Sequence, residues 1–179
     1  MRINFYGGPG VGKSTLAALT FGWLRQIGQS AELVQEWIKD WAYLGKQMKS
    51  FDQVYTFASQ LHTEDVLLQA GVEFIVTDSP VYLQCMYALH EKMKAANELW
   101  KIAARFEEAY PSINFLVLRD RTVPYEQEGR YQSLTDAKEI DRFIALCLKD
   151  WHVPVKTVGT GDIDVIRNHI DRLLRERKA

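Results

Sequence analysis

The chain has 179 residues, of which 47% are hydrophobic and 25% are charged, and its formal net charge is -1. This length and composition fit one soluble globular domain and exclude two domains of ordinary size. The near-neutral charge excludes a strong overall field toward nucleic acid or an anionic membrane, and two distant cysteines exclude a cysteine-based zinc cluster.

Apolar segments alternate with helical patterns along the chain, which predicts an α/β fold with a parallel sheet. The expected strands are 3–6, 31–34, 74–77, 113–118 and 153–158. The expected helices are 13–26, 37–44, 52–69, one or two within 81–109 with a break near 92–96, 135–149, and one capped by Asp162. We therefore expect a single domain, residues 1–179, with five parallel strands and helices on both faces.

A glycine-rich segment follows the first expected strand and leads directly into a helix. It matches the pattern GxxxxGK[ST], in which backbone N–H groups cradle phosphates at a helix N-terminus. Lys13 is expected to reach the β and γ phosphates of ATP, and the Ser14 hydroxyl to bind Mg²⁺. The flanking strand and helix disfavour an accidental turn, so we predict a P-loop formed by Gly7, Gly8, Pro9, Gly10, Val11, Gly12, Lys13, Ser14 and Thr15.

Two acids follow other expected strands, at the edge of the sheet where the P-loop lies. Asp78 can hold Mg²⁺ or accept a proton from a nucleophile, or it can cap the next helix, since a Ser-Pro pair follows. Glu36 can take the proton of an attacking hydroxyl, or it can be a solvated charge at a helix start. The serine after Asp78, where hydrolytic ATPases often carry a second acid, favours a kinase.

The residues after Glu36 mix aromatic rings and charges. Trp37 and Lys39, followed by Asp40 and Trp41, can line a pocket for a base. A helix with one apolar face gives the same pattern, so both interpretations stay open.

Residues 119–134 contain three arginines, a proline and a glycine, and predict a polar lid rather than a helix or strand. Arginines of a closing lid stabilise the charge on a transferred phosphoryl group and exclude water. Arg119, Arg121 and Arg130 are therefore candidate catalytic residues, with a solvated loop as the alternative. Gly159 and Thr160, after the last strand, either approach adenine or form a plain tight turn.

Several segments together resemble a group of bacteriophage P-loop kinases that are usually labelled AAA-type ATPases. The segments are GGPGVGKST at 7–15, ELVQEWIKD at 32–40, FDQVYTFASQ at 51–60, VTDSP at 76–80, and RDRTVPYEQEGRYQSLTDAKEID at 119–141. The resemblance runs from Ile3 to about Leu148 and implies the three-layer fold of nucleoside and nucleotide kinases. Some members are similar to 5-hydroxymethyluracil DNA kinases, which phosphorylate a modified base in phage DNA.

The resemblance implies a role for each matching segment. Phosphate binding falls on residues 7–15, an acid role on Asp78, and lid roles on the three arginines of 119–134. Glu36 becomes a substrate-side carboxylate, and Tyr82, shortly after the TDSP segment, joins Trp37 and Lys39 as a candidate substrate residue.

The expected reaction is transfer of the γ-phosphoryl group of ATP to a hydroxyl, with Mg²⁺, in the cytoplasm and without a membrane. The most specific acceptor is 5-hydroxymethyluracil in DNA, and the alternatives are a free nucleoside or nucleotide, or a non-kinase ATPase or switch. The charge of -1 weighs against a duplex binder. Lysines near 39–49 and 92–101 form either a local track for DNA or ordinary solvated helix faces. No pattern in the sequence indicates an oligomeric state.

Overall fold

The computed structural model describes the chain except for residues 37–38, 47, 50, 129 and 177–179. Its helices and strands, in chain order, are β1 (Arg2–Tyr6), α1 (Lys13–Gln26), β2 (Ala31–Val34), α2 (Lys39–Tyr43), α3 (Asp52–Gln69), β3 (Phe74–Thr77), α4 (Val81–His90), α5 (Ala96–Ala109), β4 (Ser112–Val117), α6 (Leu134–Asp150), β5 (Lys156–Val158) and α7 (Ile163–Glu176).

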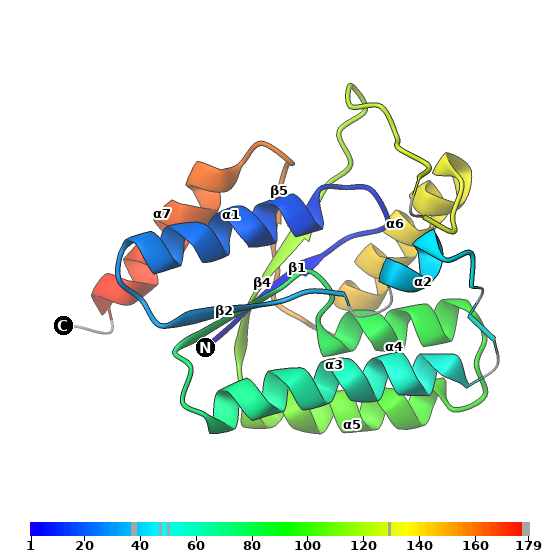
Figure 1. Ribbon diagram of the computed structural model, residues 1–179, viewed down its shortest axis with the longest axis horizontal. Helices are drawn as coiled ribbons and strands as arrows, with labels where there is room; N and C mark the ends of the chain where they lie inside the picture. The colour runs from blue at the N-terminus through cyan, green and yellow to red at the C-terminus, as the bar shows by residue number, and fades with distance from the viewer. Residues whose placement is uncertain (37–38, 47, 50, 129, 177–179) are drawn as a thin grey trace.

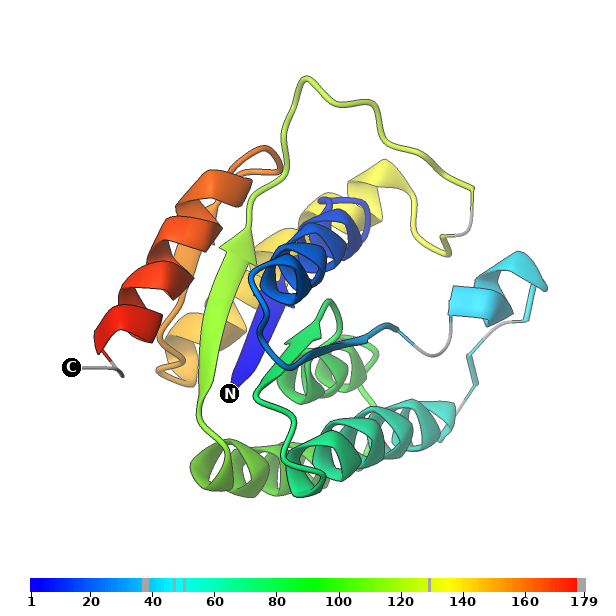
Figure 2. The same ribbon diagram turned by 60° about the vertical axis from the view of Figure 1, so that its left-hand side comes forward.

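The five strands form one parallel sheet in the order β2-β3-β1-β4-β5. The central strand β1 is buried along its whole length and pairs with β3 on one side and β4 on the other. Figures 1 and 2 show α1 and α7 on one face of the sheet and α3 to α6 on the other. The expected α/β fold with five parallel strands and helices on both faces is therefore confirmed.

Each face of the sheet has its own hydrophobic core. Leu16 and Leu24 of α1 pack with Ile166 and Ile170 of α7 against one face. The other core is built from the apolar sides of α3, α4, α5 and α6, with the largest share from α4. Seven of the ten residues of α4 are buried, which explains why its sequence shows almost no polar face.

The last strand is shorter than the sequence predicts. It begins at Lys156 rather than at residue 153 and pairs with β4 through Phe115 opposite Lys156. Pro154 precedes it and lacks the N–H that a ladder requires. The Pro154 carbonyl accepts instead from the Asn114 side chain at 3.2 Å.

Because all five strands are parallel, their carboxyl ends lie at one edge of the sheet. The P-loop follows β1 there, Glu36 follows β2, Asp78 follows β3 and Arg119 follows β4. None of the helices that the structure describes is long and apolar enough to cross a membrane.

Candidate active site

The P-loop connects β1 to α1 at this edge. Gly12 has a left-handed backbone, with φ 90°, and α1 begins at the next residue, Lys13. The Lys13 ammonium donates to the Gly8 carbonyl at 2.9 Å. Burial lowers the pKa of Lys13, and the carboxylates of Glu36 and Asp78 oppose that shift. The lysine is therefore held in a partly desolvated position that faces two acids.

Side chains from later segments occupy the space that side chains at the P-loop glycines would need. A Cβ at Gly10 would lie 2.7 Å from the ring of Tyr125 in the 119–133 segment. A Cβ at Gly12 would overlap the methyl group of Thr160, in the loop after β5, and one at Gly8 would overlap a side chain of α6. The glycines thus admit close contact from three later parts of the chain.

Asp78 and Glu36 lie beside each other because β2 and β3 are paired with Val34 opposite Thr77. Asp78 is 5% exposed, and its Oδ1 accepts from the backbone N–H of Glu36 at 3.2 Å. The helix-cap alternative for Asp78 is not what the structure shows, since α4 has Pro80 at its N-cap and no side-chain capping bond there. Asp78 reaches toward β2 instead.

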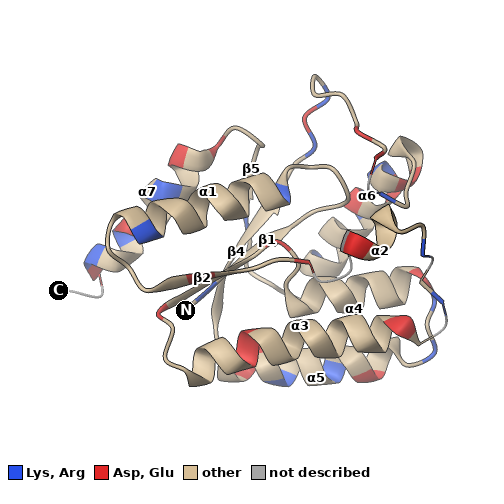
Figure 3. Ribbon diagram, viewed as in Figure 1, with Lys and Arg blue, Asp and Glu red and all other residues tan. Residues whose placement is uncertain are grey.

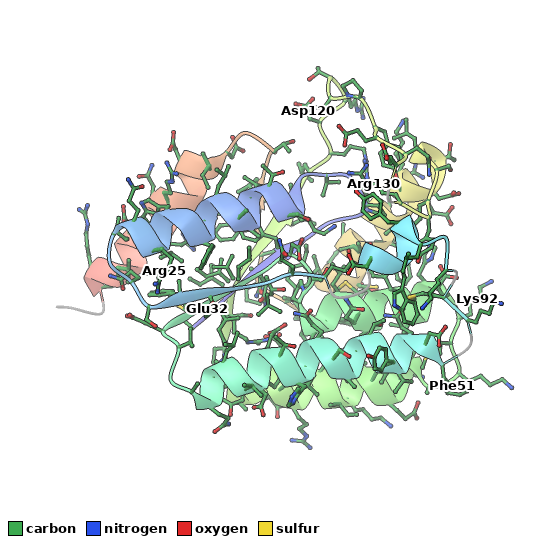
Figure 4. The ribbon with its side chains drawn as sticks, viewed as in Figure 1. Arg25, Glu32, Phe51, Lys92, Asp120 and Arg130 are labelled. Atoms are coloured by element: carbon green, nitrogen blue, oxygen red, sulfur yellow. The ribbon has the colours of Figure 1, made fainter. Side chains whose placement is uncertain are left out.

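A cavity of about 510 Å³ joins these groups. Its wall contains Lys13 and Ser14 from the P-loop, both acids, and Arg130 from the 119–133 segment. Figure 4 shows Arg130 near the start of α6, on the side of the molecule where α2 lies. The cavity thus brings the P-loop, two carboxylates and a guanidinium into one space.

Another part of the cavity wall is an amide cluster on α3 and α4 that the sequence analysis missed. Gln53 Nε2 donates to Gln84 Oε1 at 2.9 Å and to Thr56 Oγ1 at 3.0 Å. Both glutamines are at most 5% exposed and line the cavity. Gln53 Oε1 has no hydrogen-bond partner within the described part of the chain. An unpaired buried acceptor costs free energy and is uncommon in folded proteins.

The three arginines of the predicted lid lie in three different environments. Arg130 lines the cavity, and its guanidinium lies 5.4 Å from the ring of Tyr125. Arg119 instead donates to the carbonyl of Pro9 at 2.6 Å and does not contribute to the cavity wall. Arg121 is exposed in the outer part of the segment. Only Arg130 is therefore placed to meet a ligand in the cavity as the structure stands.

The segment between β4 and α6 contains no helix or strand among its described residues. It arches above the carboxyl edge of the sheet in Figures 1 and 2. The Tyr131 hydroxyl donates to the carbonyl of Lys46, in the connection between α2 and α3, at 2.5 Å. This bond links the 119–133 segment to the connection between α2 and α3.

A protein-family model described as an AAA domain (AAA_28) matches residues 2–165. The chain belongs to this family. The match covers the P-loop, both acids and the 119–133 segment in one stretch. No curated protein matches the chain.

Solved structures of a deoxyadenosine kinase from M. mycoides are similar to this AAA domain. The structure with the products dCMP and a flexible dCDP bound has 14% identity and a TM-score of 0.60. The structure with bound dATP has 18% identity and a TM-score of 0.59. Each match covers 96% of this chain and 100% of the kinase chain. The AAA domain therefore has the same fold as that kinase.

The expected substrate residues of the AAA domain fare differently. The prediction that Tyr82 lies at the substrate is corrected by the structure. Its ring packs against Trp151 in the core, with centroids 5.3 Å apart, and does not line the cavity. The neighbouring tyrosine on α4 that lines the cavity is Tyr87, and burial raises its pKa. Trp37 lies outside the described residues, and so does the side chain of Lys39.

The loop after β5 lies against the P-loop through Thr160. The Asp162 carboxylate accepts from the N–H of Gly159 at 2.6 Å, so it closes this loop as well as preceding α7. A contact with adenine stays a prediction for Gly159 and Thr160.

Proposed function

We propose that the protein is an ATP-dependent kinase that transfers the γ-phosphoryl group of ATP to a hydroxyl of a nucleoside-like acceptor. The observation that carries this proposal is the single cavity in which P-loop, acids, Arg130 and the amide cluster meet. A nucleotide switch or a plain ATPase needs the P-loop and a metal ligand, but it does not need a buried amide wall for a second ligand. The shared fold with a deoxyadenosine kinase supports the same class.

Residues 7–15 would bind the phosphates of ATP, with Lys13 at the β and γ phosphates. Mg²⁺ commonly takes one or two protein ligands and completes its shell with phosphate oxygens and water. The Ser14 hydroxyl and the Asp78 carboxylate line the same cavity and fit that requirement. No group of three or more His, Cys, Asp or Glu side chains forms a separate metal site in the described ranges. Bound Mg²⁺ would offset charge on the phosphates.

In the reaction, a bond forms between the acceptor oxygen and the γ phosphorus, and the bond from that phosphorus to the β–γ bridging oxygen breaks, releasing ADP. The acceptor proton passes to Asp78 or Glu36, and Arg130 stabilises charge on the transferred group. Asp78 also holds the backbone of Glu36. Asp78→Asn is therefore expected to lower turnover more than Glu36→Gln, and wild-type turnover in Asp78→Asn would reject its assignment.

The amide cluster supports an acceptor with hydrogen-bonding groups on a flat ring. Gln53 and Gln84 line the cavity, and their amide groups can pair with the N–H and C=O groups of a nucleobase. The most specific candidate is 5-hydroxymethyluracil in DNA, phosphorylated on its hydroxymethyl group, and its support is the resemblance of the sequence segments. Such a base would have to leave the DNA stack to enter the cavity. The alternative is a free nucleoside or nucleotide.

Charge distribution favours the free acceptor. In Figure 3, basic and acidic residues are interspersed along α5, α7 and the lid rather than gathered by sign. A duplex binder gathers positive charge to neutralise phosphates. A single flipped base in a short single strand would require less of that charge than a duplex would.

The test uses γ-labelled ATP, Mg²⁺ and matched acceptors: DNA with 5-hydroxymethyluracil, the same DNA with thymine, and free nucleosides and nucleotides. Label on an acceptor that is lost in Lys13→Ala establishes the kinase. Release of phosphate to water alone, at the same rate with every acceptor, would overturn it. Label confined to a small acceptor would reject the DNA substrate and leave the kinase intact.

The amide wall is tested separately. Gln53→Leu is expected to raise the acceptor KM by about 10-fold to 100-fold, since it removes a buried hydrogen bond to the ligand, while ATP affinity is unchanged. Gln69→Leu, on the exposed end of the same helix, is the matched control. An unchanged acceptor KM in Gln53→Leu would show that the amide cluster does not contact the acceptor.

A further inference from the structure

Asp141 of α6 is connected to the P-loop although 133 residues separate it from Gly8. Its Oδ1 accepts from the backbone N–H of Gly8 at 3.0 Å. The same carboxylate accepts two bonds from Arg119, from Nε to Oδ2 at 2.6 Å and from Nη2 to Oδ1 at 3.1 Å. Arg119 Nη2 also donates to the carbonyl of Pro9 at 2.6 Å. One carboxylate and one guanidinium thus hold the N–H and the C=O of consecutive P-loop residues.

The position of Gly8 requires the absence of a side chain. A Cβ there would overlap Asp141 Oδ1 and would lie 2.9 Å from the carbonyl of Ala137, also on α6. A backbone carbonyl in a helix cannot move aside as a flexible side chain can. Gly8 is therefore the residue that lets α6 reach the P-loop.

Asp141 and Arg119 do not line the cavity, whereas Pro9 and Lys13 do. The Asp141 side chain is 23% exposed and that of Arg119 is 12% exposed, so this ion pair is shielded from much of the solvent. Bidentate contacts between a guanidinium and a carboxylate are strong and fix geometry. Gly8 lies between Asp141 and Lys13, because its N–H donates to the Asp141 carboxylate and its carbonyl accepts from the Lys13 ammonium.

We propose that Asp141 is a positioning residue for nucleotide binding. Its carboxylate fixes Gly8 directly and Pro9 through Arg119, so that α6 and the start of the lid hold the P-loop in the shape that receives phosphates. We call Asp141 and Arg119, with their bonds to Gly8 and Pro9, the clamp. Arg130 is then the lid arginine that meets the transferred group. The proposal rests on the P-loop of the proposed function, but it concerns nucleotide binding and is independent of the acceptor.

The test is equilibrium binding of MgATP to the full chain, measured by calorimetry without any acceptor. Asp141→Ala is expected to weaken MgATP binding by about 10-fold to 100-fold, the range for loss of a charge-assisted hydrogen bond. Asp141→Asn, which keeps an oxygen for the Gly8 N–H but loses the charge, is expected to lie between Asp141→Ala and wild type. Asp150→Ala, an exposed acid at the other end of α6, is the matched control and should bind as wild type does.

A double variant separates this clamp from general loss of structure. If Asp141 acts through Arg119, adding Arg119→Ala to Asp141→Ala weakens binding little further. Effects that multiply would show that the two residues act independently and would overturn the clamp. Circular dichroism at the binding temperature verifies that each variant is folded.

The outcomes distinguish this inference from the proposed function. Wild-type affinity in a folded Asp141→Ala protein would overturn the positioning role and leave the kinase unaffected. Weakened MgATP binding in Asp141→Ala, together with a wild-type protein that labels no acceptor, would support the clamp and reject the kinase. Failure of the wild type to bind MgATP would overturn both.

Discussion

Two arginine–carboxylate clusters lie at opposite edges of the sheet and use the same chemistry for different ends. At the start of β1, Arg2 contacts Glu64 of α3 at 3.0 Å and Glu107 of α5 at 2.5 Å. At the carboxyl edge, Arg119 contacts Asp141 at 2.6 Å. The Arg2 and Glu64 side chains are 0% exposed, whereas those of Arg119 and Asp141 remain partly accessible.

The partners of each cluster explain the difference. Arg2 also donates to the carbonyl of Tyr110, at the end of α5, so its cluster joins two helices to the central strand. Glu64 accepts in addition from Gln60 at 2.7 Å, and Gln60 donates to Thr77 next to the active site. The Arg2 cluster therefore holds elements of the fold together, whereas the Arg119 cluster holds a loop in one shape. The role of an ion pair in a protein thus depends on which parts of the chain its other hydrogen bonds connect.

The largest expected effect is on stability, at the Arg2 cluster. Glu64→Ala removes one partner of a fully buried arginine and is expected to lower the free energy of unfolding by about 3–5 kcal/mol. Urea unfolding followed by circular dichroism measures it. Glu64→Gln retains the shape and polar atoms and should cost less. Equal and small losses in both variants would show that the Arg2 cluster does not stabilise the fold, and the contrast between the two clusters would fail.

A second prediction concerns the glycine beside Asp141. Gly8→Ala is expected to weaken MgATP binding by at least about 10-fold, because the added methyl group pushes the P-loop away from α6. Gly22→Ala is the matched control: Gly22 lies within α1, and an added Cβ would meet no other described part of the chain within 4 Å beyond its own helix backbone and chain neighbours. It should raise stability by about 0.5–1 kcal/mol, since alanine favours helix, and leave MgATP binding unchanged. Wild-type affinity in Gly8→Ala would show that contact with α6 does not set the P-loop shape.

The third prediction exchanges each arginine for lysine, which keeps the charge and loses the planar fork. Arg119→Lys is expected to weaken MgATP binding by about 10-fold, or about 1.4 kcal/mol, with little change in unfolding. Arg2→Lys is expected to lower stability and to leave the affinity of the folded protein unchanged. Urea unfolding and MgATP binding, both measured on both variants, test this contrast. A loss of MgATP affinity in Arg2→Lys would show that the two clusters act as one network.

The sequence predicted the parts of the site that are local in the chain. The P-loop motif, an acid at the end of β3 and an arginine-bearing excursion after β4 are each recognisable from a few neighbouring residues. The five parallel strands follow from apolar runs, and the break near residues 92–96 matches Lys92, which has φ 54°. Nothing in the sequence distinguishes Gln53 and Gln60 from ordinary polar residues of a helix.

What escaped prediction depends on contacts between distant segments. Asp141 ends a segment that the resemblance singles out, but its bond to Gly8 becomes visible only when α6 crosses the edge of the sheet. Tyr82 was expected near the substrate because it follows the TDSP segment, and helical rotation turns it into the core. The amide of Gln53 gains its meaning from Gln84, which lies on another helix.

The smallest expected effect tests whether the stability of α6 and the clamp on α6 are separable. Ser133 caps α6: its hydroxyl accepts from the N–H of Asp136, whose carboxylate accepts from the backbone N–H of Ser133. Ser133→Ala is expected to lower the free energy of unfolding by about 1 kcal/mol and to leave MgATP affinity unchanged, because Asp141 lies farther along the helix.

The pH dependence of this loss identifies its cause. Hydrogen bonds from Ser133 lower the pKa of Asp136 below its ordinary value of 3.8. A lowered acid pKa contributes stability that is present above pH 3.8 and is lost as the pH falls through the folded-state value. The difference between wild type and Ser133→Ala should therefore shrink in that acidic range, as measured by urea unfolding at a series of pH values. A constant difference would assign the loss to the hydroxyl alone, and weaker MgATP binding at neutral pH would show that the clamp depends on the start of α6.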